Sequence, residues 1–166
     1  MKWSARTVDR VAARAIYLML CIMVLWAGSS LINYSMENKF YKDYLLAWRL
    51  AGERYINKQA PWPEFTGMNH AEYMKELVER MEKRGIYPPK SNTKEPYTYI
   101  LDRLWKKEER IFILLLRERM IVYGMSQQTY DEIDEYVDGS VGMERGVFRG
   151  KTSKDGSTII GIWGMS

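Results

Sequence analysis

The chain has 166 residues, a hydrophobic fraction of 46% and a formal net charge of +4, which suit one modest domain with an attached segment. Most of this charge lies in residues 1–14, which hold four basic residues and one acidic one. No later basic stripe with interleaved aromatic residues occurs, so we expect no nucleic-acid partner. The single cysteine, Cys21, excludes an intrachain disulfide.

Residues 15–36 form an uncharged stretch of 22 positions between Arg14 and Glu37. As a helix rising about 1.5 Å per residue, this stretch would be about 33 Å long, enough to cross a hydrocarbon core of about 30 Å. We therefore predict a membrane-spanning helix that follows a basic tail or leader, residues 1–14. A cleaved secretory signal with small residues at 27–29 is the alternative, but its apolar part is usually only about 7–15 residues long.

The basic residues around this stretch predict its orientation. Four precede it, and three follow within the window of about 15 residues over which such residues are counted. Because the preceding tail is short and its arginines recur every four residues, we expect the amino end in the cytoplasm. The domain that follows the helix would then lie outside the cytoplasm.

The helical apolar period continues through residues 37–60 as an amphipathic extension of the predicted membrane helix. With the span it would form one rod from residue 15 to about residue 57, before prolines at 61 and 63 turn the chain. One apolar stripe of this helix should form its docking surface. In the first place, we expect this stripe to pack against the domain that follows. Its members are Tyr41, Tyr44, Leu45, Trp48, Ala51 and Tyr55.

Residues 61–166 are predicted to form a soluble, mostly helical α+β domain. After a linker at 59–67, a helix over about 70–84 is indicated by a capping box at Asn69 and Glu72 and by the stop residue Gly85. A proline-rich loop leads to residues 97–123, whose apolar spacing suits a helix, while "RIFILLL" also suits a buried strand. We favour a helix through about residue 109 or longer.

The last third of the chain predicts a short helix and a β-hairpin. Ser126 can cap a helix that ends at Asp138-Gly139. Apolar residues on either side of a turn at Asp155-Gly156 predict the hairpin, together giving an α+β fold with a C-terminal hairpin. Because an isolated hairpin is only marginally stable, it should pack on the amphipathic part of the rod.

The sequence contains no nucleotide-binding glycine loop, HExxH motif or Cys/His cluster, so we expect neither an enzyme nor a cofactor. Five carboxylates fall within residues 131–138. Of these, Asp134 and Asp138 are weak candidates for calcium ligands, although their spacing does not match an EF-hand loop. A solvated acidic helix face explains them better, and we predict no metal site.

The order of these parts resembles the type IV pilins and the pseudopilins of type II secretion. Locally, "YGMSQQTYDEIDEYVDGSVGMERGVFRG" is similar to a late pilin-type pattern in which a short helix leads through a glycine into a strand. "GERYINKQAPWP" is similar, more weakly, to the tyrosine and proline that close the long first helix of that family. The motif positions are Ile133, Asp134, Val137, Asp138, Gly139, Gly146 and Arg149.

The resemblance implies a structural protein of the bacterial cytoplasmic membrane whose helix binds other membrane helices or copies of itself in a larger assembly. The amino end departs from the family, because residues 15–36 hold no carboxylate. If Ala15 replaced the leader glycine, Leu20 would stand where the family has a glutamate that pairs with a neighbouring subunit. A retained leader therefore fits better than a polymerising subunit. The alternative is a bitopic accessory subunit of a large membrane complex unrelated to pilins.

Overall fold

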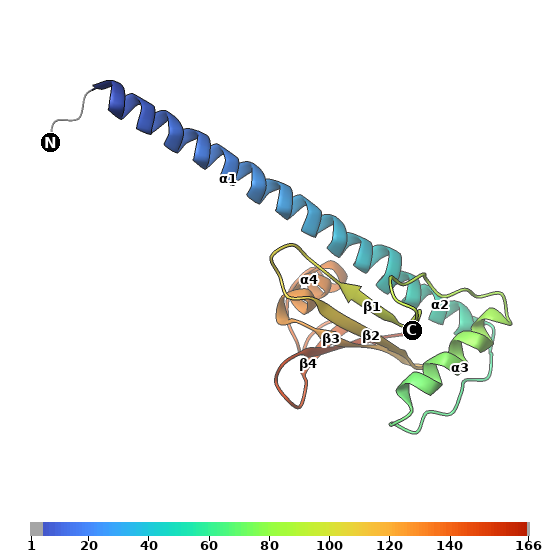
Figure 1. Ribbon diagram of the computed structural model, residues 1–166. Helices are drawn as coiled ribbons and strands as arrows, with labels where there is room; N and C mark the ends of the chain where they lie inside the picture. Colours follow the sequence, from blue (N-terminus) through green and yellow to red (C-terminus); the bar gives the residue numbers. More distant parts are fainter. Residues whose placement is uncertain (1–4, 166) are drawn as a thin grey trace.

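A long helix and a domain built on an antiparallel sheet make up the part of the chain that the structure describes (Figure 1). The structure is a computed structural model that describes residues 5–165, with side chains from Asp9 onward. Helix α1 (Ala5–Lys39), the π-helical turn η1 (Phe40–Leu45) and α2 (Leu46–Asn57) follow one another without a break. The predicted rod is thus confirmed, while part of the predicted tail, residues 1–4, lies outside the described residues.

The η1 turn is the one irregularity in the described part of the rod. A π-helical turn forms i→i+5 bonds and so accommodates about one extra residue within the helix. In η1, Phe40, Tyr44 and Leu45 are all buried. The wider turn therefore brings these three residues onto the side of the rod that faces the domain. In a regular α-helix they would be spread over a broader arc of the helix surface.

Five strands form one sheet in the order β1-β2-β3-β5-β4, with every neighbouring pair antiparallel. Their bounds are β1 Thr98–Leu101, β2 Glu109–Leu115, β3 Arg119–Met125, β4 Phe148–Thr152 and β5 Ile159–Gly164. A register shift between Val122 and Met125 bends β3, and Gly124 adopts a φ of 86° there. The backbone oxygen of Arg110 lies where a Cβ of residue 124 would stand, so only glycine fits this bulge.

The prediction of a helix in residues 97–123 is wrong, because this segment supplies β1, β2 and β3. Successive side chains of a strand point to opposite faces. In β2, Ile113 and Leu115 face the long helix while Leu114 lies on the other face, and all three are fully buried. Burial on both faces produces the unbroken apolar run that also suits a helix. The domain is therefore not mostly helical.

Two shorter helices lie close to their predicted positions, α3 (His70–Glu82) and α4 (Gln127–Asp138). The Ser126 hydroxyl accepts the Thr129 N–H at 3.2 Å, and Gly139 ends α4 with a φ of 72°, as expected of these residues. The capping box at α3 is wrong. The Asn69 carbonyl oxygen accepts from the Thr66 N–H at 2.9 Å, so this side chain orders the preceding loop instead.

The predicted C-terminal hairpin is present as β4 and β5, which pair from Phe148↔Trp163 to Thr152↔Ile159. Because a hairpin alone is only marginally stable, we expect it to pack against the rod, and it does contact the rod. The Trp163 ring stacks beside Tyr41 with centroids 6.4 Å apart, and the Arg49 guanidinium lies 4.7 Å from the Trp163 ring centroid. Since β5 is an inner strand of the sheet, this contact ties the sheet to the rod.

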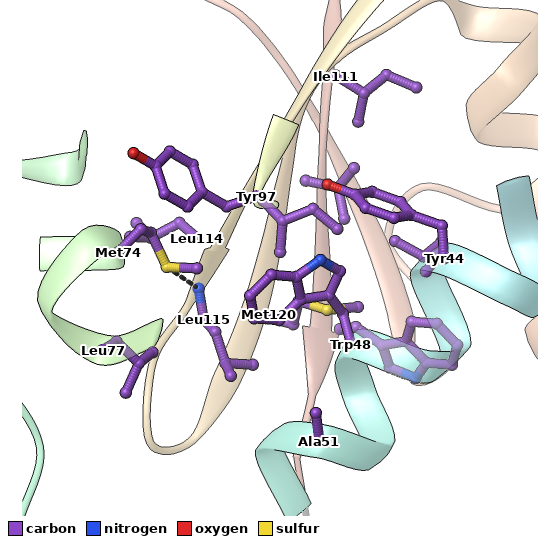
Figure 2. Close-up of a cluster of buried hydrophobic side chains, with 14 of the residues drawn as sticks. Tyr44, Trp48, Ala51, Met74, Leu77, Tyr97, Ile111, Leu114, Leu115 and Met120 are labelled. Atoms are coloured by element: carbon purple, nitrogen blue, oxygen red, sulfur yellow. Dashed lines mark hydrogen bonds between the residues drawn. The ribbon is translucent and has the colours of Figure 1, made fainter. Parts of the chain in front are cut away.

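The core lies between the sheet and the rod, and Figure 2 shows Trp48 and Ala51 of α2 opposite the sheet residues Ile111 and Met120. Helix α4 covers the same face, where the Tyr130 ring stacks on Phe148 with centroids 5.3 Å apart. At the end of β2, the Met74 sulfur of α3 accepts the Leu115 N–H at 3.3 Å. The domain thus has a helical layer on one face of the sheet and α3 across its end.

Candidate functional site

Most of the apolar stretch of α1 is not covered by any other part of the described chain. The side chains of residues 15–27 are exposed; Leu25 and Trp26, for example, are 71% and 73% exposed. Farther along the stretch, Gly28, Ser29 and Asn33 are half-buried. In the described residues this is the one helix that is long and apolar enough to cross a membrane. A contiguous apolar surface of this size is compatible with an apolar environment such as lipid or other helices.

The aromatic stripe predicted for helix docking lies against the domain of the same chain. Its five members Tyr44, Leu45, Trp48, Ala51 and Tyr55 are buried, and Tyr41 is half-buried. The Tyr44 hydroxyl and the Trp48 indole N–H both donate to the Pro96 carbonyl, at 2.9 and 3.1 Å. These six side chains are therefore occupied within the chain.

A buried ion cluster joins α1 to the domain directly below its apolar stretch. Arg103, whose side chain is only 2% exposed, lies just after β1. Its guanidinium donates to Glu37 of α1 at 2.9 Å, to Glu132 of α4 at 3.4 Å and to Glu109 at the start of β2. One cation thus binds carboxylates from three elements. Because breaking such a buried pair leaves an uncompensated charge, the cluster fixes the orientation of α1 on the sheet.

The cluster holds more negative than positive charge. Lys106 lies 3.1 Å from Glu37 and 3.9 Å from Glu132, so two cations face three carboxylates. Burial, and then the Glu37 carboxylate, raise the pKa of Glu132, whereas Gln128, Lys106 and Arg103 oppose this shift. Glu109 is further bound by the Ser126 N–H at 2.8 Å, which connects the cluster to the start of α4.

The connection between β1 and β2, residues 102–108, lies beside α1 on the amino-terminal side of this cluster. The Asn33 side chain makes two hydrogen bonds to Leu104: its carbonyl oxygen accepts the backbone N–H at 2.7 Å, and its amide donates to the backbone carbonyl at 3.2 Å. Trp105 follows with a φ of 64° and is 93% exposed. We call residues 102–108 the anchor loop.

The calcium candidates Asp134 and Asp138 act as acceptors for the backbone of the α4–β4 connection. Asp138 accepts the N–H groups of Val147 and Phe148 at 3.0 and 2.9 Å. Asp134 is fully buried, and one of its oxygens accepts the Gly142 N–H at 2.6 Å, while Oδ1 has no hydrogen-bond partner among the described residues. In the described part of the chain, no group of three His, Cys, Asp or Glu residues could hold a metal ion.

The other motif positions lie around the same connection. Both Ile133 and Val137 belong to α4; Ile133 is buried, and Val137 is partly buried against the core. Gly146 has a φ of 92°, and a Cβ at this position would meet the Asp138 carboxylate. Arg149 on β4 is exposed and donates from Nε to the Gly146 carbonyl at 3.3 Å. Asp138, Gly146 and Arg149 therefore shape one turn between α4 and β4.

Sequence reasoning missed Arg103, Glu109, Thr129 and Asn33, which form the junction between α1 and the domain. The available signal was a charged residue at the start of an apolar strand, Glu109, close to Arg103. Their partner Glu37 lies 66 residues before Arg103, so nothing local pairs them. Comparison of the chain with protein-family models, curated proteins and solved structures found no match.

Proposed function

We propose that this chain is a single-pass membrane protein with a structural, pilin-like role, in which α1 docks with other membrane helices or with copies of itself in a larger assembly. The observation that carries the proposal is the uncovered apolar stretch of α1 on a helix that continues into the domain core. An apolar helix of this length outside the fold is stable within a bilayer.

The pilin-like part of the proposal is supported by the arrangement of the elements. A long helix whose distal part packs against the C-terminal hairpin of a small α+β domain is the arrangement expected from the resemblance (Figure 1). The motif residues Asp138, Gly146 and Arg149 meet in one turn. We place the protein in the bacterial cytoplasmic membrane, with the domain outside the cytoplasm, on the resemblance and on the basic tail.

A bitopic accessory subunit of a large membrane complex is the second candidate, favoured by one observation. The apolar stretch holds no carboxylate, and Leu20 stands where a polymerising pilin would carry its glutamate. Such a subunit would use the same exposed helix surface to bind different, larger proteins. The two candidates therefore differ in the proteins that α1 binds, and they share the membrane helix α1.

Membrane insertion is tested by alkaline carbonate extraction of membranes that contain the full chain. We expect the protein to remain in the pellet and to be released only by detergent. A matched variant with Val24→Arg and Leu25→Arg places two charges in the middle of the stretch, which cost about 2.5–3.5 kcal/mol each on insertion scales. It should shift into the soluble fraction. Extraction of the unaltered chain by carbonate alone would refute the proposal.

The partner is tested by oxidative cross-linking through Cys21, the native cysteine, which is exposed on the apolar stretch. A cysteine on the aromatic stripe would be a poor probe, since that stripe is buried. Disulfide-linked copies of this chain would support the pilin-like assembly, whereas adducts with larger membrane proteins would support the accessory subunit. A Cys21→Ser variant is the control, and the amino-terminal residue of the purified protein shows whether a leader is removed.

A further inference from the structure

The anchor loop carries an apolar tip that the domain does not use. Leu104 is 40% exposed and Trp105 is 93% exposed, next to the exposed Lys107. In Figure 1 the connection between β1 and β2 lies on the side of the domain nearest the amino-terminal part of α1. We propose that Leu104 and Trp105 enter the headgroup region of the same bilayer that α1 crosses and form a second membrane contact. This inference rests on the proposed insertion of α1.

The depth of the loop follows from its attachment to α1. Asn33, which binds Leu104, lies within the uncharged stretch 15–36, whose midpoint is between residues 25 and 26. At about 1.5 Å per residue, Asn33 is about 11 Å from the midpoint, inside a half-core of about 15 Å. Tilting the helix only lowers this value. Leu104, bound to Asn33, therefore lies about 4 Å inside the edge of the hydrocarbon core, just below the headgroup region.

The hydrogen bonds of the loop suit a position of low polarity. A backbone amide that leaves water needs an internal partner, because an unpaired group is costly in lipid. Both backbone groups of Leu104 have one, supplied by the single Asn33 side chain. The Lys106 N–H adds a turn bond to the Arg103 carbonyl at 3.2 Å. A loop surrounded by water would not need this double bond from Asn33.

The exposed residue at the tip has the chemistry of the membrane interface. Tryptophan is enriched at that depth because its ring is apolar and its N–H can reach water or headgroups. Trp105 adopts a positive φ, which is unfavourable for a residue other than glycine and requires support from its surroundings. The buried Arg103 and the Asn33-bound Leu104 hold the backbone before Trp105, and the bond from the Lys106 N–H to the Arg103 carbonyl closes the turn after it.

A hollow between α1 and the anchor loop changes from apolar to charged along its length. Trp26, Leu104 and Trp105 line its apolar part, and Lys106, Glu37 and Glu132 line its charged part. The apolar lining lies toward the middle of the uncharged stretch, and the charged lining lies at its end. This is the order in which a phospholipid presents its chains and its headgroup, so we assign the lipid interface as the occupant of this surface.

Depth-dependent fluorescence quenching tests the inference on the full chain, reconstituted into phosphatidylcholine vesicles at a low protein-to-lipid ratio. An environment-sensitive fluorophore is attached to native Cys21 or, in a Cys21→Ser background, to Trp105→Cys or Met68→Cys. Met68 is the matched control, because it is 89% exposed and lies in the connection after the far end of the rod. Lipids carry a nitroxide either on the headgroup or in the middle of the acyl chain.

We expect the label at position 105 to be quenched several-fold more by the headgroup nitroxide than the label at position 68. The label at Cys21 should be quenched mainly by the mid-chain nitroxide. If the label at 105 behaves like that at 68 while Cys21 is quenched, the inference is wrong and α1 still inserts. If Cys21 is not quenched, the proposed insertion fails and the inference fails with it.

Two further measurements keep the result decisive. Should Trp105→Cys fail to fold, the exposed neighbour Lys107→Cys carries the label instead. Raising the protein density in the vesicles separates lipid from protein as the occupant. Quenching at 105 that is independent of density supports the lipid contact, whereas shielding that appears only at high density would assign the surface to a second copy and overturn the inference.

Discussion

Asp134 and Asp138 lie one turn apart on α4 and satisfy different parts of the connection to β4. Asp138 uses both of its oxygens for backbone N–H groups, one of them on the buried Phe148, whereas Asp134 keeps one buried oxygen without a partner. The first carboxylate stabilises the turn. The second carries an unfavourable buried charge, since burial raises the pKa of Asp134.

Asp138→Ala is expected to lower the free energy of unfolding by about 1–3 kcal/mol, because it leaves a buried N–H without an acceptor. Denaturant titration of the purified protein measures this change. Asp131→Ala on the same helix, which loses only a surface bond to Gln127, should stay within about 0.5 kcal/mol. Equal losses in both variants would contradict the role given to Asp138.

Acidification toward the ordinary pKa values of two carboxyl groups, 4.5 for Glu132 and 3.8 for Asp134, is expected to increase the contribution of both groups to the stability of the domain. The pKa values of Glu132 and Asp134 are both raised by burial, so the stability they contribute is present at low pH and lost as pH rises through the raised values. The opposite shift at Asp155, whose pKa is lowered to about 2 by Ser153 and Ser157, acts only below its ordinary value near 3.8.

The melting temperature as a function of pH measures this effect. A Glu132→Gln, Asp134→Asn variant, which removes both titrating groups and keeps their shape, should show a flatter profile over the same range. Equally steep profiles for the wild type and the variant would contradict the role given to these two groups.

Residues with a local role were predictable from sequence, and those with distant partners were not. Ser126 and Gly139 were recognised because a cap or a stop depends on neighbours a few residues away. Asn69 had the correct local pattern but bonds to the preceding loop. Asn33 is a polar residue in an apolar stretch, and its partner Leu104 is 71 residues away, so its role became visible only in the fold.

At the scale of elements, the junction between α1, β2 and α4 depends on Arg103. Arg103→Ala would leave the buried Glu109 and the Glu37 and Glu132 carboxylates without their shared cation. We expect a loss of about 3–5 kcal/mol in the free energy of unfolding. Chemical denaturation checks this value.

Arg110→Ala is the matched control for this prediction. Arg110 lies on β2 next to Glu109, is exposed and forms no salt bridge in the described part of the chain. Its removal should change stability by no more than about 0.5 kcal/mol. If the two arginine variants were equally stable, the buried cluster would not hold α1 to the domain.

The elements with one exposed face were easier to predict than the inner strands. The rod, α3, α4 and the hairpin each show a period set by one buried side. The inner strand β2 ends in Ile113, Leu114 and Leu115, which are all buried, so the alternation that identifies a strand is lost there. The bulge at Gly124 further interrupts the period of β3.

At the scale of the whole molecule, the core is independent of the apolar stretch. Every buried core residue lies between Phe40 and Trp163. A chain that begins at Glu37 is therefore expected to be folded and soluble in water, within about 1–2 kcal/mol of the full chain, since it loses mainly the Asn33 bonds to Leu104.

Size-exclusion chromatography without detergent and far-UV circular dichroism of residues 37–166 test this expectation. The full chain, which keeps the exposed apolar helix, should require detergent in the same buffer. Aggregation of the truncated chain would show that the amino-terminal part of α1 contributes to the folding of the domain and not only to membrane attachment.

The π-helical turn at Phe40–Leu45 sets the rotation of α1 about its own axis relative to the domain. One residue more or fewer in a helix rotates everything before it by about 100° and displaces it by about 1.5 Å along the axis. Deleting one residue from this turn would leave the hydropathy of the apolar stretch of α1 unchanged. It would nevertheless rotate the surface of that stretch by a quarter-turn or more around the helix axis. Under the proposed docking of α1 in a membrane, the rotational orientation of α1 toward its neighbours is set by six residues of the rod that lie beyond the apolar stretch, Phe40–Leu45.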